Sequence, residues 1–310
     1  MNKYYLSIDI GGTDIKYALI DKAGNIFQKG KTKTPTTSLL AFQKSINHII
    51  TQFSPHIRGV AFSIPGKTDN QSGIVYHGGS LPFLDHVNFR QLFGKPYDLP
   101  ISIENDGKSA ALAELWLGNL KNVDSGVAIV LGTGIGGGII LNHQLYYGSN
   151  LMAGEFSFVA SNYSNGDYLD NSIGLDLSAV QMVNKIGNKL RLKNPTDGPT
   201  VFQYINQNDS RIGSIFIDYC SHVAKLILSL QAVLDVNRFV IGGGISAQSI
   251  VTNTIRKELG VLFKENKLVY NTIGDIDIQQ AKFGSDANLF GALYSFLLQI
   301  DSKNSRRSIL

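Results

Sequence analysis

Short uninterrupted apolar runs and helical repeats of apolar residues alternate along this chain. The run at residues 4–10 ends in a double glycine and a second apolar segment follows at once, which predicts two strands joined by a tight turn. Between residues 38 and 53 the apolar positions return every three or four residues, which predicts an amphipathic helix. A buried strand is expected at residues 59–64, where a Pro-Gly pair ends the apolar run.

The rest of the chain keeps this alternation. A short apolar run leads into Glu104, Asn105 and Asp106 and then into a helix-forming segment, so acidic side chains are expected at a strand-to-helix junction. We further expect a polar loop at 161–176, a long amphipathic helix at 212–234, a strand at 238–241, a helix within 246–263, a strand near 276–280 and a last amphipathic helix at 287–298. Because strands and helices alternate, the predicted fold class is α/β.

One unit of this pattern occurs twice. A strand, a glycine turn and a strand lie at residues 4–20 and again at 126–142, with Gly12 and Gly134 at corresponding places in the two turns. This repetition predicts two related halves. No Pro-rich or Ser-rich linker separates them, so we expect the boundary near residues 118–124 to be a hinge.

Composition narrows the class of protein. A chain of 310 residues can form one or two domains with a substantial core. Its 17% of charged residues, against ~25% in typical proteins, excludes disorder driven by charge repulsion. The net charge is +4 and the basic residues are scattered, so nucleic acid is not an expected partner. The single cysteine, Cys220, excludes an internal disulfide and a multi-cysteine zinc site.

Two observations bear on the compartment. The apolar run before Asp9 is too short for the apolar region of a signal peptide, so we expect a cytoplasmic protein. Residues 125–154 carry no formal charge, which raises the question of a membrane span. The apolar stretch is shorter than the ~20 residues that a span needs, and its glycines indicate a turn between strands, so no membrane association is expected.

Three glycine-rich turns follow strands, at residues 9–16, 132–138 and 242–244. Glycine lets backbone N–H groups approach a phosphate, and successive N–H groups in such turns form an anion cradle. A hairpin or a helix cap explains any one of these turns, whereas three of them at strand ends favour a nucleotide. The middle turn contains G-x-G-x-G-G but continues as a strand, so a Rossmann site is not expected, and no P-loop sequence is present.

Six motifs occur in order along nearly the whole chain. They are DIGGTDIK at 9–16, SIPG at 63–66, ENDGKSAALAE at 104–114, LGTGIGGGI at 131–139, AGEF at 153–156 and FVIGGGIS at 239–246. In this order they resemble the motifs of the ROK family of sugar kinases and sugar-responsive repressors. The resemblance implies the duplicated actin-like ATPase (ribonuclease H-like) fold, with two lobes and a cleft between them. The lobes are expected at residues 1–120, with a C-terminal helix at about 287–300 packed back on this lobe, and at 121–286, followed by a polar tail at 301–310.

The resemblance also implies a role for each motif residue. Asp106 matches the family's catalytic base, which accepts the proton of the attacking sugar hydroxyl. The residues expected to bind the sugar are Gly79, Ser80, Asn105, Asp106 and Glu155. Those expected to bind the nucleotide are Asp9, which holds Mg²⁺ through water, Gly11, Gly12, Thr13, Lys16, Thr133 and Gly134 at the phosphates, and Gly242 and Gly243 at the adenosine. The alternatives are a helix N-cap for Asp106, a solvated loop carboxylate for Glu155 and a surface strand lysine for Lys16.

The chain departs from the family's pattern at the zinc site. Most members have a G-E-x-G-H sequence followed by a cysteine cluster, but here Phe158 replaces the histidine and no cysteine follows before Cys220. Zinc is therefore not expected. The family's next sugar-binding glutamate has no counterpart that spacing identifies, and Asp167, Asp170 and Asn171 are the candidates. Phe158 makes the sugar site apolar at the position of the family's histidine, which favours an aglycone or a second sugar beside this ring.

These features predict an ATP-dependent kinase for a hydroxyl, expected to be the 6-hydroxyl, of a hexose or a β-glucoside. The stretch HGGSLPFLDHVNF and the missing zinc loop look most similar to β-glucoside kinases. The alternatives are a glucokinase, an N-acetylmannosamine-type monosaccharide kinase and a non-catalytic sugar-binding protein; a repressor is not expected, because no helix-turn-helix fits ahead of Asp9. The expected partners are a small-molecule sugar and ATP. The resemblance also implies a homodimer, with the helix at 212–234 as a candidate contact face.

Overall fold

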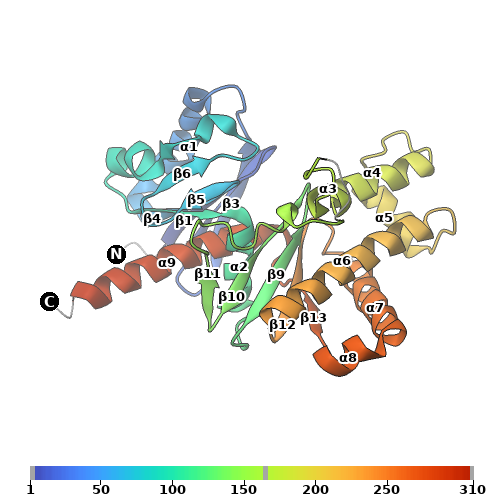
Figure 1. Cartoon of the computed structure of the whole chain (residues 1–310). Helices are drawn as coiled ribbons and strands as arrows, with labels where there is room; N and C mark the ends of the chain where they lie inside the picture. Colours follow the sequence, from blue (N-terminus) through green and yellow to red (C-terminus); the bar gives the residue numbers. More distant parts are fainter. Residues whose placement is uncertain (1–3, 163–166, 308–310) are drawn as a thin grey trace. The chain divides into compact units, whose positions relative to one another are not determined.

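The chain forms two compact units in the computed structural model, which describes residues 4–162 and 167–307 (Figure 1). The first unit comprises the described residues of 4–118, 145–153 and 286–307, and the second those of 119–144 and 154–285. The chain therefore passes into the second unit, returns to the first for one short segment, and returns again for the last helix.

The first unit is built on a five-stranded sheet with the order β3-β2-β1-β4-β8. Its strands are β1 (Tyr4–Ile10), β2 (Asp14–Asp21), β3 (Ile26–Lys33), β4 (Ile57–Ile64) and β8 (Ile101–Asn105). Strand β1 pairs antiparallel with β2 and parallel with β4, and β4 pairs parallel with β8. Nearly all residues of β1, β4 and β8 are buried, which is typical of parallel strands that are covered on both faces.

Three long helices belong to this unit: α1 (Leu39–Phe53), α2 (Asp106–Leu117) and α9 (Ala287–Arg307). Helix α1 begins where the Ser38 side chain accepts a hydrogen bond from the Ala41 N–H. Helix α9 packs against α2 and against β1, β4 and β8 (Figure 1). One polar contact supports this packing, because the Ser7 hydroxyl on β1 donates to the Leu289 carbonyl on α9 at 2.7 Å.

A smaller sheet with the order β5-β6-β7 lies between β4 and β8 in the sequence. Its strands are β5 (Lys67–Asp69), β6 (Ile74–His77) and β7 (Val87–Asn88), and the same stretch contains the short helices η2 (Pro82–Leu84), η3 (Arg90–Gly94) and η4 (Lys95–Tyr97), whereas η1 (Ser54–His56) follows α1. Phe89 packs edge to face on Phe62 of β4 and on Phe93, with ring centroids 5.1 Å apart in both pairs. Phe42 of α1 joins the same cluster, so this segment shares one aromatic core with the main sheet.

A second five-stranded sheet has the order β11-β10-β9-β12-β13, and its strands belong to the second unit except for β11, of which only Gln144 does. The strands are β9 (Gly126–Leu131), β10 (Ile135–Leu141), β11 (Gln144–Tyr146), β12 (Arg238–Gly243) and β13 (Asp277–Gln280). The helices are α3 (Ile173–Asp176), α4 (Ala179–Lys189), α5 (Gly198–Asn206), α6 (Gly213–Leu234), α7 (Ser249–Glu265) and α8 (Lys267–Ile273), with the short η5 (Phe156–Phe158) and η6 (Gly284–Asp286).

The two large sheets follow the same plan. In each, the first strand pairs antiparallel with the second across a glycine turn and parallel with the fourth, which pairs parallel with the fifth. The turns that contain Gly12 and Gly134 occupy the same place in the two sheets. The predicted α/β class and the predicted repetition are therefore confirmed.

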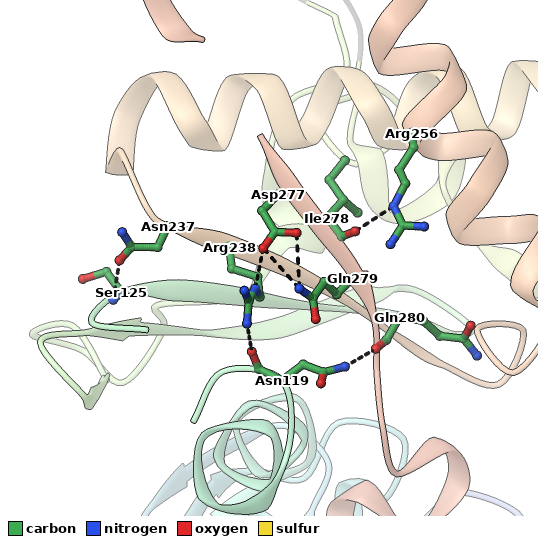
Figure 2. Close-up of polar contacts among 9 residues, drawn as sticks. All are labelled: Asn119, Ser125, Asn237, Arg238, Arg256, Asp277, Ile278, Gln279 and Gln280. Atoms are coloured by element: carbon green, nitrogen blue, oxygen red, sulfur yellow. Dashed lines mark hydrogen bonds and ion pairs between the residues drawn. The ribbon is translucent and has the colours of Figure 1, made fainter. Parts of the chain in front are cut away.

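Polar contacts fix the beginning of the second unit at the edge of its sheet (Figure 2). Arg238 of β12 donates through Nη1 to the Asn119 carbonyl at 2.7 Å and through Nε to the Asp277 carboxylate at 2.6 Å. The Asn119 side chain in turn donates to the Gln280 carbonyl of β13 at 2.7 Å. The residue that follows the end of the first unit is thus bonded to two strands of the second (Figure 2).

Two boundaries differ from those expected from the sequence. Residues 145–153, expected in the second lobe, lie in the first unit, where Tyr147 donates a hydrogen bond to Glu104. The last helix continues to Arg307 rather than giving way to a polar tail at residue 301. Polar residues extend a helix readily once apolar packing has nucleated it, so the polar pattern did not mark its end. Residues 308–310 of the expected tail lie outside the described residues.

Some elements were absent from the sequence predictions. Strands β5, β6 and β7 are two to four residues long and α8 is short, so none of them produces a clear periodic pattern. Helix α3 interrupts the loop expected at 161–176, of which residues 163–166 lie outside the described part of the chain.

Among the described residues, one helix has the length and hydropathy of a membrane span. This is α6, with 22 residues and a mean hydropathy of 1.2 over an 18-residue window. A core helix of a soluble protein meets the same criteria, and α6 buries Phe216, Val223 and Ile227 in the second unit. The observation is therefore weak evidence for a span.

The contact between α9 and α2 allows a test of the packing. A Cβ added at Gly291 of α9 would overlap the Ser109 carbonyl oxygen of α2. We expect Gly291→Ala to lower the free energy of unfolding by ~1–3 kcal/mol, although alanine favours a helix more than glycine does. Gly260→Ala in α7 is the control, because an added Cβ there meets nothing within 4 Å, and it should raise the free energy of unfolding by ~0.5–1 kcal/mol. Urea unfolding measures both, and a stabilised Gly291→Ala variant would contradict the close packing.

Candidate active site

Three parallel strands of the first unit end side by side, and each carries a polar residue near its end. Asp9 of β1 lies opposite Ser63 of β4, and Ser63 lies opposite Glu104 of β8. Because the carboxyl ends of parallel strands meet at one edge of a sheet, these three residues gather there although they are far apart in the sequence.

Asp9 is nearly buried, with 7% of its surface exposed. Its Oδ1 accepts hydrogen bonds from Ser63 Oγ and from Asn288 Nδ2 of α9, both at 3.0 Å. Burial raises the pKa of Asp9, while these two hydrogen bonds and the charge of its cross-strand partner Lys16 act in the opposite direction. The carboxylate is therefore held in one orientation. The sequence motif identified Asp9, but no sequence signal could identify Asn288, which lies 279 positions away.

The turn after β1 brings Gly12 close to Ser80, and both are predicted site residues. A Cβ added at Gly12 would lie 3.3 Å from Ser80 Oγ, so the turn lies close to the Gly79-Ser80 segment. Thr34 supports the turn, since its Oγ1 donates to the Gly11 carbonyl at 2.6 Å and its N–H donates to the Thr13 carbonyl at 3.0 Å. Gly12 and Thr13 in this turn are exposed.

Asn105 caps helix α2, and Asp106 is the first residue of that helix. The Asn105 Oδ1 accepts from the Lys108 N–H at 3.0 Å, and its Nδ2 donates to Asp106 Oδ1 at 3.0 Å and to the Gly66 carbonyl at 2.9 Å. Asp106 Oδ1 also accepts from the Gly107 N–H at 2.8 Å. The N-cap alternative for Asp106 is thus wrong, because Asn105 has that role and holds the Asp106 carboxylate in place.

A tight corner places Gly66 and Gly79 beside this cap. Both have positive φ, +87° at Gly66 and +58° at Gly79. A Cβ added at Gly66 would overlap the His77 carbonyl, and one at Gly79 would lie 3.3 Å from the Gly66 nitrogen. Glycine is therefore needed at both positions. The predicted sugar-binding residue Gly79 lies next to Gly66, whose carbonyl accepts from Asn105.

Glu104 is fully buried, and the sequence motif that contains it indicates no separate role for this residue. Its Oε2 accepts from the Tyr147 hydroxyl at 2.7 Å and the Ser295 hydroxyl at 2.9 Å, and its Oε1 accepts from the Asn105 N–H at 3.0 Å. Burial raises the pKa of Glu104, and these hydrogen bonds and the charge of Lys108 oppose the rise. The bonds offset part of the cost of removing the carboxylate from water.

In the second unit, Thr133 and Gly134 lie in the turn between β9 and β10. The Gly132 N–H donates to the Gly134 carbonyl at 3.0 Å, and the Ile135 N–H donates to Ser157 Oγ at 2.9 Å. A Cβ added at Gly134 would lie 2.8 Å from Ser157 Oγ, so a larger residue would displace that serine. Ser157 therefore supports this turn, a role that the sequence motif does not indicate.

The two glycines at the end of β12, Gly242 and Gly243, differ in how much space a side chain would have. Gly243 has a φ of +97°, and an added Cβ there would overlap the Leu131 carbonyl of β9. A Cβ at Gly242 would meet Ala281 at 3.5 Å, which is ordinary contact. Ser246 continues this turn, because its N–H and hydroxyl donate to the Gly243 carbonyl at 3.1 and 2.8 Å. The close approach of two strands thus requires Gly243 but not Gly242.

Glu155 stands at the start of η5, where its side chain makes no capping hydrogen bond. It follows Gly154, whose φ of +90° and close approach to the Gly137 carbonyl, 2.6 Å from an added Cβ, require glycine. Phe158 ends η5 with 51% of its surface exposed, and its carbonyl accepts from the Tyr168 hydroxyl at 2.6 Å.

Within the described part of the chain, no three His, Cys, Asp or Glu side chains come together as a metal site. Two of the candidates for the missing glutamate form a local turn, in which Asp167 Oδ1 accepts from the Leu169 N–H at 2.8 Å and the Asn171 side chain donates to the Asp167 carbonyl at 3.1 Å. Asp170 is exposed. Their roles at the sugar stay predictions.

The fold and the placement of these residues define a class of protein. Two sheets of the same plan, each with a glycine turn between its first two strands, form the duplicated actin-like ATPase fold. The sequence matches the ROK family over residues 5–167 and 178–298, and the chain belongs to this family.

Two relatives and one solved structure are similar over nearly the whole chain. The β-glucoside kinase of Listeria monocytogenes serovar 1/2a is 26% identical, with 94% of this chain and 96% of the relative covered. The N-acetylmannosamine kinase of Haemophilus influenzae strain 86-028NP is 28% identical, with 93% and 94% covered. The structure of a ROK family protein from Streptococcus pneumoniae TIGR4 in complex with sucrose has a TM-score of 0.81 and is 25% identical, with 96% and 99% covered.

The buried Glu104 predicts a dependence of stability on pH. Its pKa in the folded protein lies above the ordinary 4.5, so the folded state binds the proton more tightly than the unfolded state does. The contribution of Glu104 to stability is therefore fully present below pH 4.5 and is lost as pH rises through the folded pKa. Glutamine does not ionise, so the Glu104→Gln variant does not lose stability in this way as pH rises. The free energy of unfolding of the variant minus that of wild type should therefore increase from acid to neutral pH.

Urea unfolding at a series of pH values measures this difference. Glu265→Gln, at an exposed position on α7, is the matched control and should show no such trend. A difference between Glu104→Gln and wild type that stays constant with pH would contradict a raised pKa at Glu104.

Proposed function

We propose that this protein transfers the γ-phosphate of ATP to the 6-hydroxyl of a hexose or a β-glucoside, with Asp106 as the general base. The chain is an ATP-dependent sugar kinase of the ROK family, and its relatives include kinases named for β-glucosides and for N-acetylmannosamine. The observation that carries the mechanism is the position of Asp106 at the start of α2, where Asn105 caps the helix and its amide orients the Asp106 carboxylate.

The proposed step is a direct transfer. The Asp106 carboxylate accepts the proton of the sugar hydroxyl while that oxygen bonds to the γ-phosphorus and the bond to the β–γ bridging oxygen breaks. The Asn105 amide and the Gly107 N–H both bond to Asp106 Oδ1, which fixes the side chain. A base that is already oriented loses little entropy when the substrate binds.

Asp9 suits the proposed role at Mg²⁺. It is a carboxylate fixed at a strand end by Ser63 and Asn288, next to a glycine turn, and Mg²⁺ takes oxygen ligands of this kind directly or through water. When bound there, Mg²⁺ neutralises charge on the phosphates. Burial raises the pKa of Asp9, and a cation nearby would favour its ionised form. We propose no zinc in this reaction, because Phe158 replaces the histidine of the family's zinc site.

The proposal assigns the nucleotide to the glycine turns of the two units. Gly11, Gly12, Thr13, Lys16, Thr133 and Gly134 bind the phosphates, and Gly242 and Gly243 bind the adenosine. Support comes from close approaches that favour glycine at four of these positions, Gly11, Gly12, Gly134 and Gly243, where an added Cβ would crowd a neighbouring atom. Lys16, the cross-strand partner of Asp9, brings a positive charge to the same strand end.

The sugar is assigned to Gly79, Ser80, Asn105 and Glu155 together with Asp106. Gly79 and Asn105 adjoin the same residue, Gly66, and Ser80 lies beside the glycine turn of β1. Carboxylates and amides can each hold two adjacent hydroxyls, which suits Glu155 and Asn105 to a hexose.

Two further proposals concern the substrate and the assembly. The second candidate function is a monosaccharide kinase, because one relative is named for N-acetylmannosamine. We place the protein in the cytoplasm as a homodimer that uses α6 as a contact face. Ile217 and Val233 on this helix are 42% and 80% exposed, and such a contact would cover them.

Asp106→Asn tests the mechanism. The amide keeps the shape of the carboxylate but cannot accept the proton, so kcat should fall by ~10²–10⁴ while the dissociation constant for the sugar changes by less than about tenfold. Release of ADP in a coupled assay gives kcat. The control is Asp209→Asn, which removes an exposed ion pair with Arg211 in the second unit and should leave kcat unchanged. A loss below about tenfold in Asp106→Asn would place the base elsewhere.

A comparison of glucose with methyl β-glucoside tests the substrate class. The apolar ring of Phe158 makes no hydrogen bond to the anomeric hydroxyl, so replacing that hydroxyl by a glycosidic oxygen should change kcat/KM by less than about tenfold. The same ADP assay with each sugar measures this ratio. A preference for glucose of about a hundredfold or more would favour the monosaccharide kinase.

A further inference from the structure

The loop at residues 78–85 follows β6 in the first unit and carries Gly79 and Ser80, two of the proposed sugar-binding residues. Both of these residues are exposed, whereas Leu81 and Leu84 further along the loop are buried in the core of the unit. The loop is thus anchored in the core at one place and open at another. The contacts that hold its open part therefore decide where Gly79 and Ser80 lie.

The carboxylate of Asp85 joins the two ends of this loop. Its Oδ1 accepts a hydrogen bond from the Gly78 N–H at 2.7 Å. Gly78 is buried, and a buried N–H without an acceptor is costly, so this bond fixes the first peptide of the loop. The Asp85 side chain is itself 41% exposed, so its removal leaves no cavity in the core. A substitution at Asp85 can therefore release the loop while the fold stays intact.

The backbone around Gly78 is closely packed. A Cβ added at Gly78 would overlap the Leu81 carbonyl. One added at Gly66 would overlap the His77 carbonyl and lie 2.7 Å from the Gly79 nitrogen. Because little free space surrounds these peptides, a shift of Gly78 moves Gly79 with it.

Ser80 connects the same loop to the turn after β1. A Cβ added at Gly12 would lie 3.3 Å from Ser80 Oγ, so Ser80 lies beside the turn proposed for the phosphates. Ser80 follows Gly78 after one residue, so its position depends on the peptide that Asp85 holds. The Asp85 carboxylate thus acts on the proposed sugar site through the backbone of Gly78.

We propose that Asp85 is a positioning residue for the sugar, because its bond to the Gly78 N–H sets the place of Gly79 and Ser80 beside the glycine turn of β1. The inference rests on the proposed function, since it deepens the assignment of Gly79 and Ser80 to the sugar. The neighbouring His77 has no part in this role. Its Nδ1 lies 3.3 Å from the same Asp85 oxygen, but the His77 side chain is 68% exposed and the bond to Gly78 does not depend on it.

Three variants test this role with glucose or methyl β-glucoside, whichever wild type phosphorylates better. Asp85→Ala removes the acceptor of the Gly78 N–H, so KM for the sugar should rise at least about tenfold while kcat changes by less than about threefold. Asp85→Asn keeps an oxygen that can accept this bond and should return KM to within about threefold of wild type. The matched control is His77→Ala, which removes the exposed pair with Asp85 and should leave KM within about twofold of wild type.

Hydrogen exchange of the Gly78 amide gives a second readout, which does not depend on activity. Mass spectrometry of peptides that cover residues 78–81 should show exchange at least about tenfold faster in Asp85→Ala than in wild type, because the bond that protects this amide is gone. The Asp85→Asn and His77→Ala variants should exchange like wild type. Unchanged exchange in Asp85→Ala would mean that Asp85 does not hold the loop, and the inference would be wrong.

The outcomes separate this inference from the proposed function. A merely structural role of Asp85 would lower kcat through loss of folded protein and leave KM unchanged in Asp85→Ala. That result would overturn the inference while the kinase proposal stands, and so would a rise in KM that Asp85→Asn does not reverse or that His77→Ala reproduces.

If wild type phosphorylates no sugar, the proposed function fails, and calorimetric titration with glucose and methyl β-glucoside decides the role of Asp85 separately. Binding to wild type that is weakened by Asp85→Ala and kept by Asp85→Asn would support the role. Equal binding by all variants, or no binding by wild type, would overturn it.

Discussion

A carboxylate buried away from water must be surrounded by hydrogen-bond donors, and the first unit is organised around one such group, Glu104. Its donors come from four parts of the chain: Asn105 on the same strand, Asn70 between β5 and β6, Tyr147 on the segment that returns from the second unit, and Ser295 on α9. Removing any of them would leave the carboxylate with fewer hydrogen bonds, so a single side chain joins four parts of the first unit.

Glu104 and Asp106 are two acidic residues close together in the sequence whose different positions give them different roles. Glu104 faces the interior at the end of a buried strand and serves as an acceptor that holds other groups in place. Asp106 begins the helix, and its Oδ1 accepts hydrogen bonds from its chain neighbours Asn105 and Gly107. Asn105 links the two acids, because its N–H bonds to Glu104 and its amide bonds to Asp106. The structural acid thus supports the proposed base through one residue.

The sequence allowed the main plan of the fold to be predicted, because that plan follows from local patterns. Apolar runs ended by glycine identified β1, β4 and β9, and three- to four-residue repeats identified α1 and α6. The repetition of strand, turn and strand led to the two matching sheets. The predicted site residues came from motifs that are continuous in the sequence, such as the one that contains Asp9 and the one that contains Asp106.

The rest depends on contacts between distant residues, for which a single sequence has no signal. Asn288 bonds to Asp9 and Ser295 bonds to Glu104 only because α9 packs on the first sheet. The place of residues 145–153 depends in the same way on Tyr147 reaching Glu104. A capping preference could not decide between Asn105 and Asp106 either, because both residue types favour the cap and only the backbone shows where the helix begins.

The place of α9 in the first unit has a consequence for the order of folding during synthesis. The ribosome makes 4–118 first, yet this part obtains the Ser295 and Asn288 donors only after the whole second unit has been made. The second unit, by contrast, is one stretch of chain interrupted only by residues 145–153. While the polypeptide grows, the unit that begins first is therefore the unit that finishes last, and Asp9 and Glu104 lack two of their donors until the last helix has been translated.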